Sequence, residues 1–159
     1  MSTSILIIPC SGIGKAFGTI SRDSTYRVVE DLKEGETDTM CLSLLVMGDE
    51  DALRSVKSHR CIAVDGCPNE CAKKNLELSG ANLVANFRVV DILRDHRGLK
   101  PEGVTFLNEG GRILAKILAE KIALKVDELN YMGCCSCVRL KLGLFPAVVS
   151  VASRELSLG

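Results

Sequence analysis

Near the middle of the chain runs Cys61-Ile62-Ala63-Val64-Asp65-Gly66-Cys67-Pro68-Asn69-Glu70-Cys71-Ala72-Lys73-Lys74, which predicts a strand, a turn and a helix in succession. The first four residues are apolar and include β-branched side chains, the pattern of a buried strand. We expect a helix over residues 68–78, because proline fits the first helical position, where no N–H is needed. Cys67 would then be the N-cap, and Cys71 would lie one turn further along.

This spacing would bring two thiols together at the positive end of a helix. Such a place lowers the pKa of a thiol and favours the thiolate, the form that binds metal ions. The alternative is two buried cysteines beside an ordinary turn. Against it, Asp65-Gly66 and Pro68 flank Cys67 with turn-forming residues that a core helix would not need.

Strands and helices alternate on both sides of this segment. The pattern predicts strands at residues 4–8, 37–45, 61–64 and 81–87, and helices at residues 19–32, 49–57, 68–78 and 110–129. Alternation of this kind is typical of the α/β class. We therefore expect residues 1–159 to form a single three-layer Rossmann-like α/β domain with a mainly parallel sheet of about four strands.

The positions of three cysteines relative to the predicted strands differ. In parallel sheets, functional groups gather at the carboxyl ends of the strands. Cys10 follows the first predicted strand and Cys67 follows the third, so both are expected at that edge. Cys61 begins the third strand and lies roughly 20 Å from Cys67 at the rise of an extended chain. Cys61 is therefore predicted to be a core thiol.

Composition excludes several classes of partner. Lysine plus arginine equals aspartate plus glutamate, at 20 residues each, so nothing favours nucleic acid or an anionic membrane surface. The apolar run at residues 5–8 is too short for a signal peptide, and no apolar run approaches the ~18 residues of a membrane span. We expect a cytoplasmic protein without a nucleic-acid or membrane partner.

The number of cysteines limits the kinds of metal site that the chain could form. Eight cysteines stand beside only two histidines, so a tightly bound soft metal would be held mainly by sulfur. In a reducing compartment, clustered thiols are more often metal ligands or redox groups than disulfides. Sulfur ligands alone do not separate zinc from an iron–sulfur cluster.

Four stretches of the chain together resemble the DGC-domain family, whose members are expected to bind zinc. They are a turn at Cys10-Ser11-Gly12, a helix start at Ser21-Arg22, a strand at Cys41-Leu42, and Asp-Gly-Cys-Pro-x-x-Cys-Ala at residues 65–72. The resemblance covers about residues 4–130. It implies that the metal cysteines are Cys10, Cys41, Cys67 and Cys71.

One position departs from the family pattern. Ser43 stands where relatives tend to have proline after Cys-Leu, which weakens the placement of Cys41. From the residues alone, Cys41 is explained equally well as a core thiol of its predicted strand. The resemblance favours a metal ligand.

A second group of thiols comprises Cys134, Cys135 and Cys137. Three thiols in four residues cannot easily close on one another as a disulfide. We expect them to be a second set of metal ligands, which would cap the first site, form another, or pass metal between the two. The alternative is an incidental cluster.

Two catalytic interpretations of the Cys10 loop fail on sequence. A phosphatase loop needs arginine six positions after its cysteine, to clamp phosphate, but position 16 is alanine. A Walker A loop needs glycine where Pro9 stands and serine or threonine where Ala16 stands. Asp65 is expected to form a turn rather than to support a metal ligand. No catalytic residue is assigned.

The leading hypothesis is a cytoplasmic, cysteine-rich zinc-binding protein that serves as an accessory or metal/sulfur-handling module, with a protein partner or a second copy of itself. The competing hypothesis is an iron–sulfur protein, or a thiol-based redox or transfer enzyme using Cys10 or the cysteines at 134–137. In a third hypothesis the site is structural, and the apolar segment 140–156 forms a dimer or partner surface.

Overall fold

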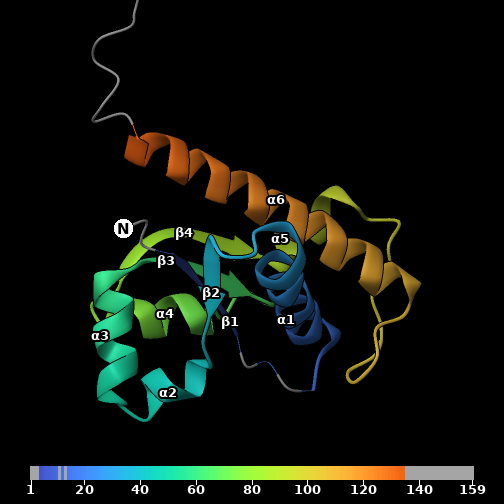
Figure 1. Ribbon diagram of the computed structural model, residues 1–159. Coiled ribbons are helices and arrows are strands. Elements are labelled where there is room, and N and C mark those ends of the chain that lie inside the picture. The colour runs from blue at the N-terminus through green and yellow to red at the C-terminus, as the bar shows by residue number, and fades with distance from the viewer. Residues whose placement is uncertain (1–3, 11, 13, 135–159) are drawn as a thin grey trace, which may run out of the picture.

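The computed structural model describes residues 4–10, 12 and 14–134. Four of the described segments form one sheet: β1 (Ile5–Pro9), β2 (Thr37–Thr39), β3 (Arg60–Asp65) and β4 (Asn82–Arg88). Their order is β2-β1-β3-β4, and every neighbouring pair is parallel (Figure 1). The prediction of a Rossmann-like α/β fold with a parallel sheet of four strands is confirmed.

Helices cover both faces of the sheet. They are α1 (Ala16–Arg27), its π-helical continuation η1 (Val28–Leu32), α2 (Leu42–Val46), α3 (Glu50–Ser58), α4 (Cys71–Leu78), α5 (Val89–Asp95) and α6 (Glu109–Cys134). In Figure 1, α6 runs along one side of the sheet while α2, α3 and α4 lie on the other. The fold therefore has three layers.

Alternate residues of β1 point into different hydrophobic clusters, which is why the whole strand is apolar. Ile5 and Ile7 pack with buried side chains of α1, α5 and α6. Leu6 and Ile8 pack with buried side chains of α2, α3 and α4. Fully burying one such side chain contributes about 1.5–3 kcal/mol, so both faces of this central strand stabilise the fold.

The strand predicted over residues 37–45 is wrong beyond Thr39. Leu42 and Leu45 are buried while Leu44 is exposed, a spacing of three that fits the helix α2 and not the period of two of a strand. Cys41 is therefore not a strand residue. It is the N-cap of α2, with an extended backbone and an exposed side chain.

Residues 89–95 form a helix, α5, that the sequence pattern did not predict. Val89 and Ile92 are buried against the cluster that contains α1 and α6. No glycine or proline separates this helix from β4, so the local signals that usually mark a boundary are missing.

The far end of α6 lies at the amino edge of the sheet. Arg60, the first residue of β3, donates to the Leu129 carbonyl at 2.7 Å and to Asn130 Oδ1 at 2.9 Å. Asn130 in turn donates to Glu36, which precedes β2. Among the described helices, none combines the length and apolar character that crossing a membrane would require.

Candidate functional site

Cys10 is held at the carboxyl edge of the sheet by two contacts with the end of β3. Its N–H donates to the Val64 carbonyl at 2.9 Å, and its sulfur accepts the Gly66 N–H at 3.2 Å. The side chain is buried, with 6% of its surface exposed. Because Gly66 directly precedes Cys67, Cys10 and the turn carrying Cys67 lie at the same edge, as the strand pattern predicts.

Glycines allow three backbone segments to meet around the Cys10 sulfur. A Cβ on Gly66 would lie 2.9 Å from the backbone carbon and oxygen of Phe17, and one on Gly18 would overlap the Gly12 carbonyl. Contacts this close leave no room for a side chain. The loop after β1, the first turn of α1 and the turn after β3 can therefore pack only because these residues are glycines.

The Ser21-Arg22 pair on α1 faces the same edge. The Ser21 hydroxyl, fully buried, donates to the Val64 carbonyl at 2.6 Å and so fixes α1 to the end of β3. Arg22 lines a pocket of about 220 Å³ together with Tyr26 and both Cys10 and Cys41. Two of the four predicted ligand cysteines therefore share one pocket, with a guanidinium on its wall.

Cys41 is an exposed thiol with a polar neighbour. Its sulfur lies 2.9 Å from the Ser43 hydroxyl. The pKa of Cys41 is lowered, first by the Ser43 hydroxyl and then by the Ser43 backbone N–H, because both stabilise a thiolate. Ser43 is thus the residue that most favours ionisation of this cysteine.

The helix that follows β3 begins later than the sequence predicts. The structure starts α4 at Cys71, so Pro68 is not its first residue and Cys67 is not its N-cap. A turn closed by the Glu70 N–H and the Cys67 carbonyl, at 3.3 Å, takes its place. Cys71 is exposed and Cys67 is partly exposed on this turn and helix start.

Asp65 determines where α4 begins. Its carboxylate accepts the Ala72 N–H at 2.8 Å and the Lys73 N–H at 3.1 Å, two of the unpaired donors at the start of the helix. The side chain is almost fully buried. Burial raises the pKa of Asp65, and this effect outweighs the two N–H contacts, which lower it. Asp65 therefore caps a helix from outside it, which is more than the predicted role in a turn.

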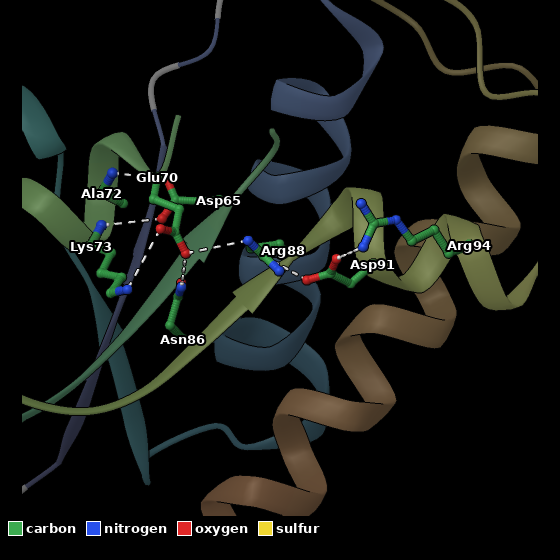
Figure 2. Close-up of polar contacts among 8 residues, drawn as sticks. All are labelled: Asp65, Glu70, Ala72, Lys73, Asn86, Arg88, Asp91 and Arg94. Atoms are coloured by element: carbon green, nitrogen blue, oxygen red, sulfur yellow. Dashed lines mark hydrogen bonds and ion pairs between the residues drawn. The ribbon is translucent and has the colours of Figure 1, made fainter. Parts of the chain in front are cut away.

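Glu70 fixes the other side of the turn, as Figure 2 shows. It is the only non-glycine residue with positive φ among those described, at 52°. Its carboxylate accepts a hydrogen bond from Asn86 at 3.0 Å and lies 3.7 Å from Arg88, both on β4. Arg88 also donates to Asp91 of α5 at 2.5 Å. No sequence pattern indicates these contacts, because they depend on β4 lying beside β3.

The candidate ligands do not form a closed set in the described structure. Cys10 and Cys41 share a pocket, whereas Cys67 and Cys71 lie on the neighbouring turn and helix start. Within residues 4–10, 12 and 14–134, no three side chains of histidine, cysteine, aspartate or glutamate are grouped to hold a metal ion.

Cys61 is a core thiol, as predicted. It is fully buried, and its sulfur donates to the Val56 carbonyl at 3.3 Å. Burial raises the pKa of Cys61 to about 11, so it stays a neutral thiol at physiological pH.

Only one residue of the second predicted thiol group falls within the described structure. Cys134 is the last residue of α6, whose end contacts the amino edge of the sheet through Asn130. This position is opposite the edge that carries Cys10, so it does not support a role for Cys134 in capping the first site. Cys135 and Cys137 lie outside the described residues.

The fold and site define a class: a parallel α/β domain with thiols gathered at the carboxyl edge of its sheet. The family model of the DGC domain matches residues 6–105, more than half of the chain. The chain therefore belongs to the DGC-domain family. Neither the curated proteins nor the solved structures contain a significant match to it.

Proposed function

We propose that this chain is a cysteine-rich zinc-binding protein of the cytoplasm that acts as an accessory module in metal or sulfur handling. The ligands would be Cys10, Cys41, Cys67 and Cys71. One observation carries the proposal: Cys10 contacts the residue before Cys67 and shares a pocket with Cys41. Cysteines distant in sequence thus meet at one edge of the sheet.

The chemistry of the donor set fits zinc. Four thiolates satisfy its tetrahedral coordination without water, the pattern of a structural site. Such a site has a net negative charge, and the Arg22 guanidinium on the pocket wall would offset part of it. Bound zinc would supply a crosslink between the ends of β1 and β3, or a cargo for transfer.

Binding would require movement of two side chains. Cys41 and Cys71 are exposed, so no core packing holds their thiols in place. Cys10 and the turn after β3 are anchored by hydrogen bonds and would provide the fixed half of the site. Cys10, Cys41, Cys61, Cys67 and Cys71 are free thiols, which accords with a reducing compartment.

Metal analysis of the protein purified without oxygen tests the proposal. We expect a colourless protein with about one zinc ion per chain, as a four-thiolate site would hold. Cys10→Ser and Cys67→Ser should each lose the metal, and Cys61→Ser is the matched control that should keep it. A metal-free wild type, or equal zinc in Cys10→Ser and Cys61→Ser, would contradict the proposal.

The same preparation tests the second thiol group. Changing Cys134, Cys135 and Cys137 together to serine should lower the zinc content if these residues form a metal site of their own. An unchanged content would remove that part of the proposal. Light scattering on both proteins would also report whether a second copy of the chain is the partner.

One observation favours the competing class, a thiol-based redox or transfer enzyme. Cys41 is exposed in a pocket, and its pKa is lowered, as a nucleophilic thiol requires. A brown preparation would instead indicate an iron–sulfur cluster. Chelator treatment followed by thiol alkylation distinguishes the cases, because only thiols that a metal protects become more reactive.

A further inference from the structure

A groove runs along α1, between this helix and the segment that leads into α6. Two pockets, of about 240 and 460 Å³, share Thr19, Asp23 and Thr105 in their walls and therefore adjoin. The larger pocket also shares Arg22 and Tyr26 with the thiol pocket. The groove thus begins beside Cys10 and Cys41 and extends to the start of α6.

The walls of this groove are held in place. The Thr19 hydroxyl donates to the Val104 carbonyl at 2.5 Å, which ties the loop to α1. Asn108 Oδ1 accepts the Gly111 N–H at 2.8 Å and the Glu102 N–H at 3.1 Å. A Cβ on Gly103 would overlap the Phe106 carbonyl, so the loop is also tightly turned. The groove is a built feature and not a gap between loose segments.

Three arginines line the groove without acidic partners. Among the ion pairs of the described residues, none includes Arg22, Arg27 or Arg112. The Arg27 Nε–H is buried and has no acceptor in the described part of the chain. A buried donor left unpaired is costly and is usually completed by a water or an ion.

We propose that this groove binds the phosphate group of a small molecule, held between Arg27 of α1 and Arg112 of α6. Both arginines line the smaller pocket, and the guanidinium fork matches the oxygens of phosphate. Phosphate is favoured over a carboxylate because its three oxygens can accept from two guanidinium groups and a threonine hydroxyl together. That hydroxyl would come from Thr105, which lines the same pocket, because the Thr19 hydroxyl already donates to the Val104 carbonyl.

Asp23 is the one acidic side chain among the residues that line the two pockets, and it provides a second test of phosphate binding. Its carboxylate repels a phosphate in the pocket, while its removal would leave only cationic and neutral groups there. Asp23→Asn should therefore tighten phosphate binding, whereas a change that merely loosened the structure would weaken it.

Calorimetric titration of the full chain with inorganic phosphate, at ionic strength held constant with sodium chloride, tests the proposal. We expect measurable binding by the wild type, a loss of about tenfold or more in Arg27→Gln and in Arg112→Gln, and a gain in Asp23→Asn. Arg54→Gln is the control, because this arginine lies on α3, across the sheet, and should bind phosphate like the wild type.

Two results would overturn the proposal. The first is a wild type that binds citrate, a carboxylate ligand, but does not bind phosphate. The second is an Arg54→Gln protein whose phosphate affinity falls as much as that of Arg112→Gln. Arg112 is exposed, so its substitution should leave folding intact even if Arg27→Gln unfolds. Cys10→Ser should retain phosphate binding, which keeps the outcome separate from that of the zinc proposal.

Discussion

Burial and hydrogen bonding shift the pKa of Asp65 in opposite directions, and the net shift predicts how stability depends on pH. Burial raises its pKa from the ordinary value of 3.8, despite two N–H donors that favour the charged form. The folded chain therefore binds the Asp65 proton more tightly than the unfolded chain does. Stability from this group is fully present below the unfolded pKa and is lost as the pH rises through the folded pKa.

The first prediction follows from the upward shift in the pKa of Asp65. As the pH rises from the ordinary pKa of 3.8 through the higher pKa of the folded state, the free energy of unfolding of the wild type should fall relative to Asp65→Asn, which has no carboxyl to ionise. Below that window, where Asp65 is protonated, the two proteins should have nearly the same free energy of unfolding, because a protonated carboxyl and an amide each offer one carbonyl oxygen to the two N–H groups. Urea denaturation across this range measures both quantities. Exposed Asp51→Asn is the control, and a pH slope equal in Asp65→Asn and the wild type would contradict the prediction.

A second prediction concerns Cys41. Ser43→Pro removes both the hydroxyl and the N–H that lower the pKa of Cys41. Proline is tolerated in the first turn of a helix, so α2 should still form. Alkylation of Cys41 near neutral pH should become slower, and the difference should vanish at alkaline pH, where the thiol of both proteins is ionised.

Mass spectrometry of the alkylated protein provides the measurement and an internal control. Cys61 should remain unlabelled in both proteins without denaturant, because it is fully buried and burial raises its pKa to about 11. Equal Cys41 rates in Ser43→Pro and the wild type at neutral pH would show that Ser43 does not activate this thiol.

At the scale of elements, the junction of β3, α1 and the loop after β1 depends on glycine. Gly66→Ala would place a Cβ 2.9 Å from the Phe17 backbone, which cannot yield without moving α1. We expect a loss of about 1–3 kcal/mol in the free energy of unfolding, the usual cost of overpacking. Cys10 is buried at this junction, so its side chain should also become more accessible to alkylating reagents when the junction opens.

The matched control for this change is Gly98→Ala. Nothing lies within 4 Å of a Cβ at that position, and its φ is not positive. Its stability should change little, or rise slightly through the lower entropy of the unfolded chain. Comparable losses in both variants would mean that the glycine packing around Cys10 is not tight.

Local sequence signals predicted those elements whose boundaries are marked locally. β1, β3, β4 and α3 were predicted to within two residues, because glycine, proline or a capping residue such as Asp49 marks at least one end of each element. The start of α4 and the position of Cys41 were missed for another reason. They depend on Asp65 reaching residues seven and eight positions ahead, and on Leu42 and Leu45 packing under the sheet.

The candidate metal site also has some features that the sequence predicts and others that depend on contacts between distant segments. The convergence of Cys10 and the Cys67 turn was predictable, because parallel strands place their carboxyl ends at one edge. The contacts of Glu70 with Asn86 and Arg88 were not, because they require the order of the strands in the sheet. The groove along α1 was also missed, since its walls come from segments about 85 residues apart.

At the scale of the whole molecule, α6 is part of the core although the family match ends before it, at residue 105. Leu114, Leu118, Ile122 and Val126 are fully buried in the same cluster as Ile5 and Ile62 of the sheet. Hydrogen bonds from Arg60 fix the other end of the helix. We therefore expect α6 to unfold together with the sheet, in a single transition.

A pair of leucine substitutions in α6 tests this expectation. Leu118→Ala should lower the free energy of unfolding by about 2–5 kcal/mol, because it leaves a cavity between the helix and the sheet. Leu124 is 68% exposed on the same helix, so Leu124→Ala should cost little. Denaturation followed by circular dichroism, with hydrogen exchange resolved by segment, would report whether β1 and α6 open together. If Leu118→Ala released α6 while β1 stayed protected, the helix would be an appendage of the family domain and not a layer of its core.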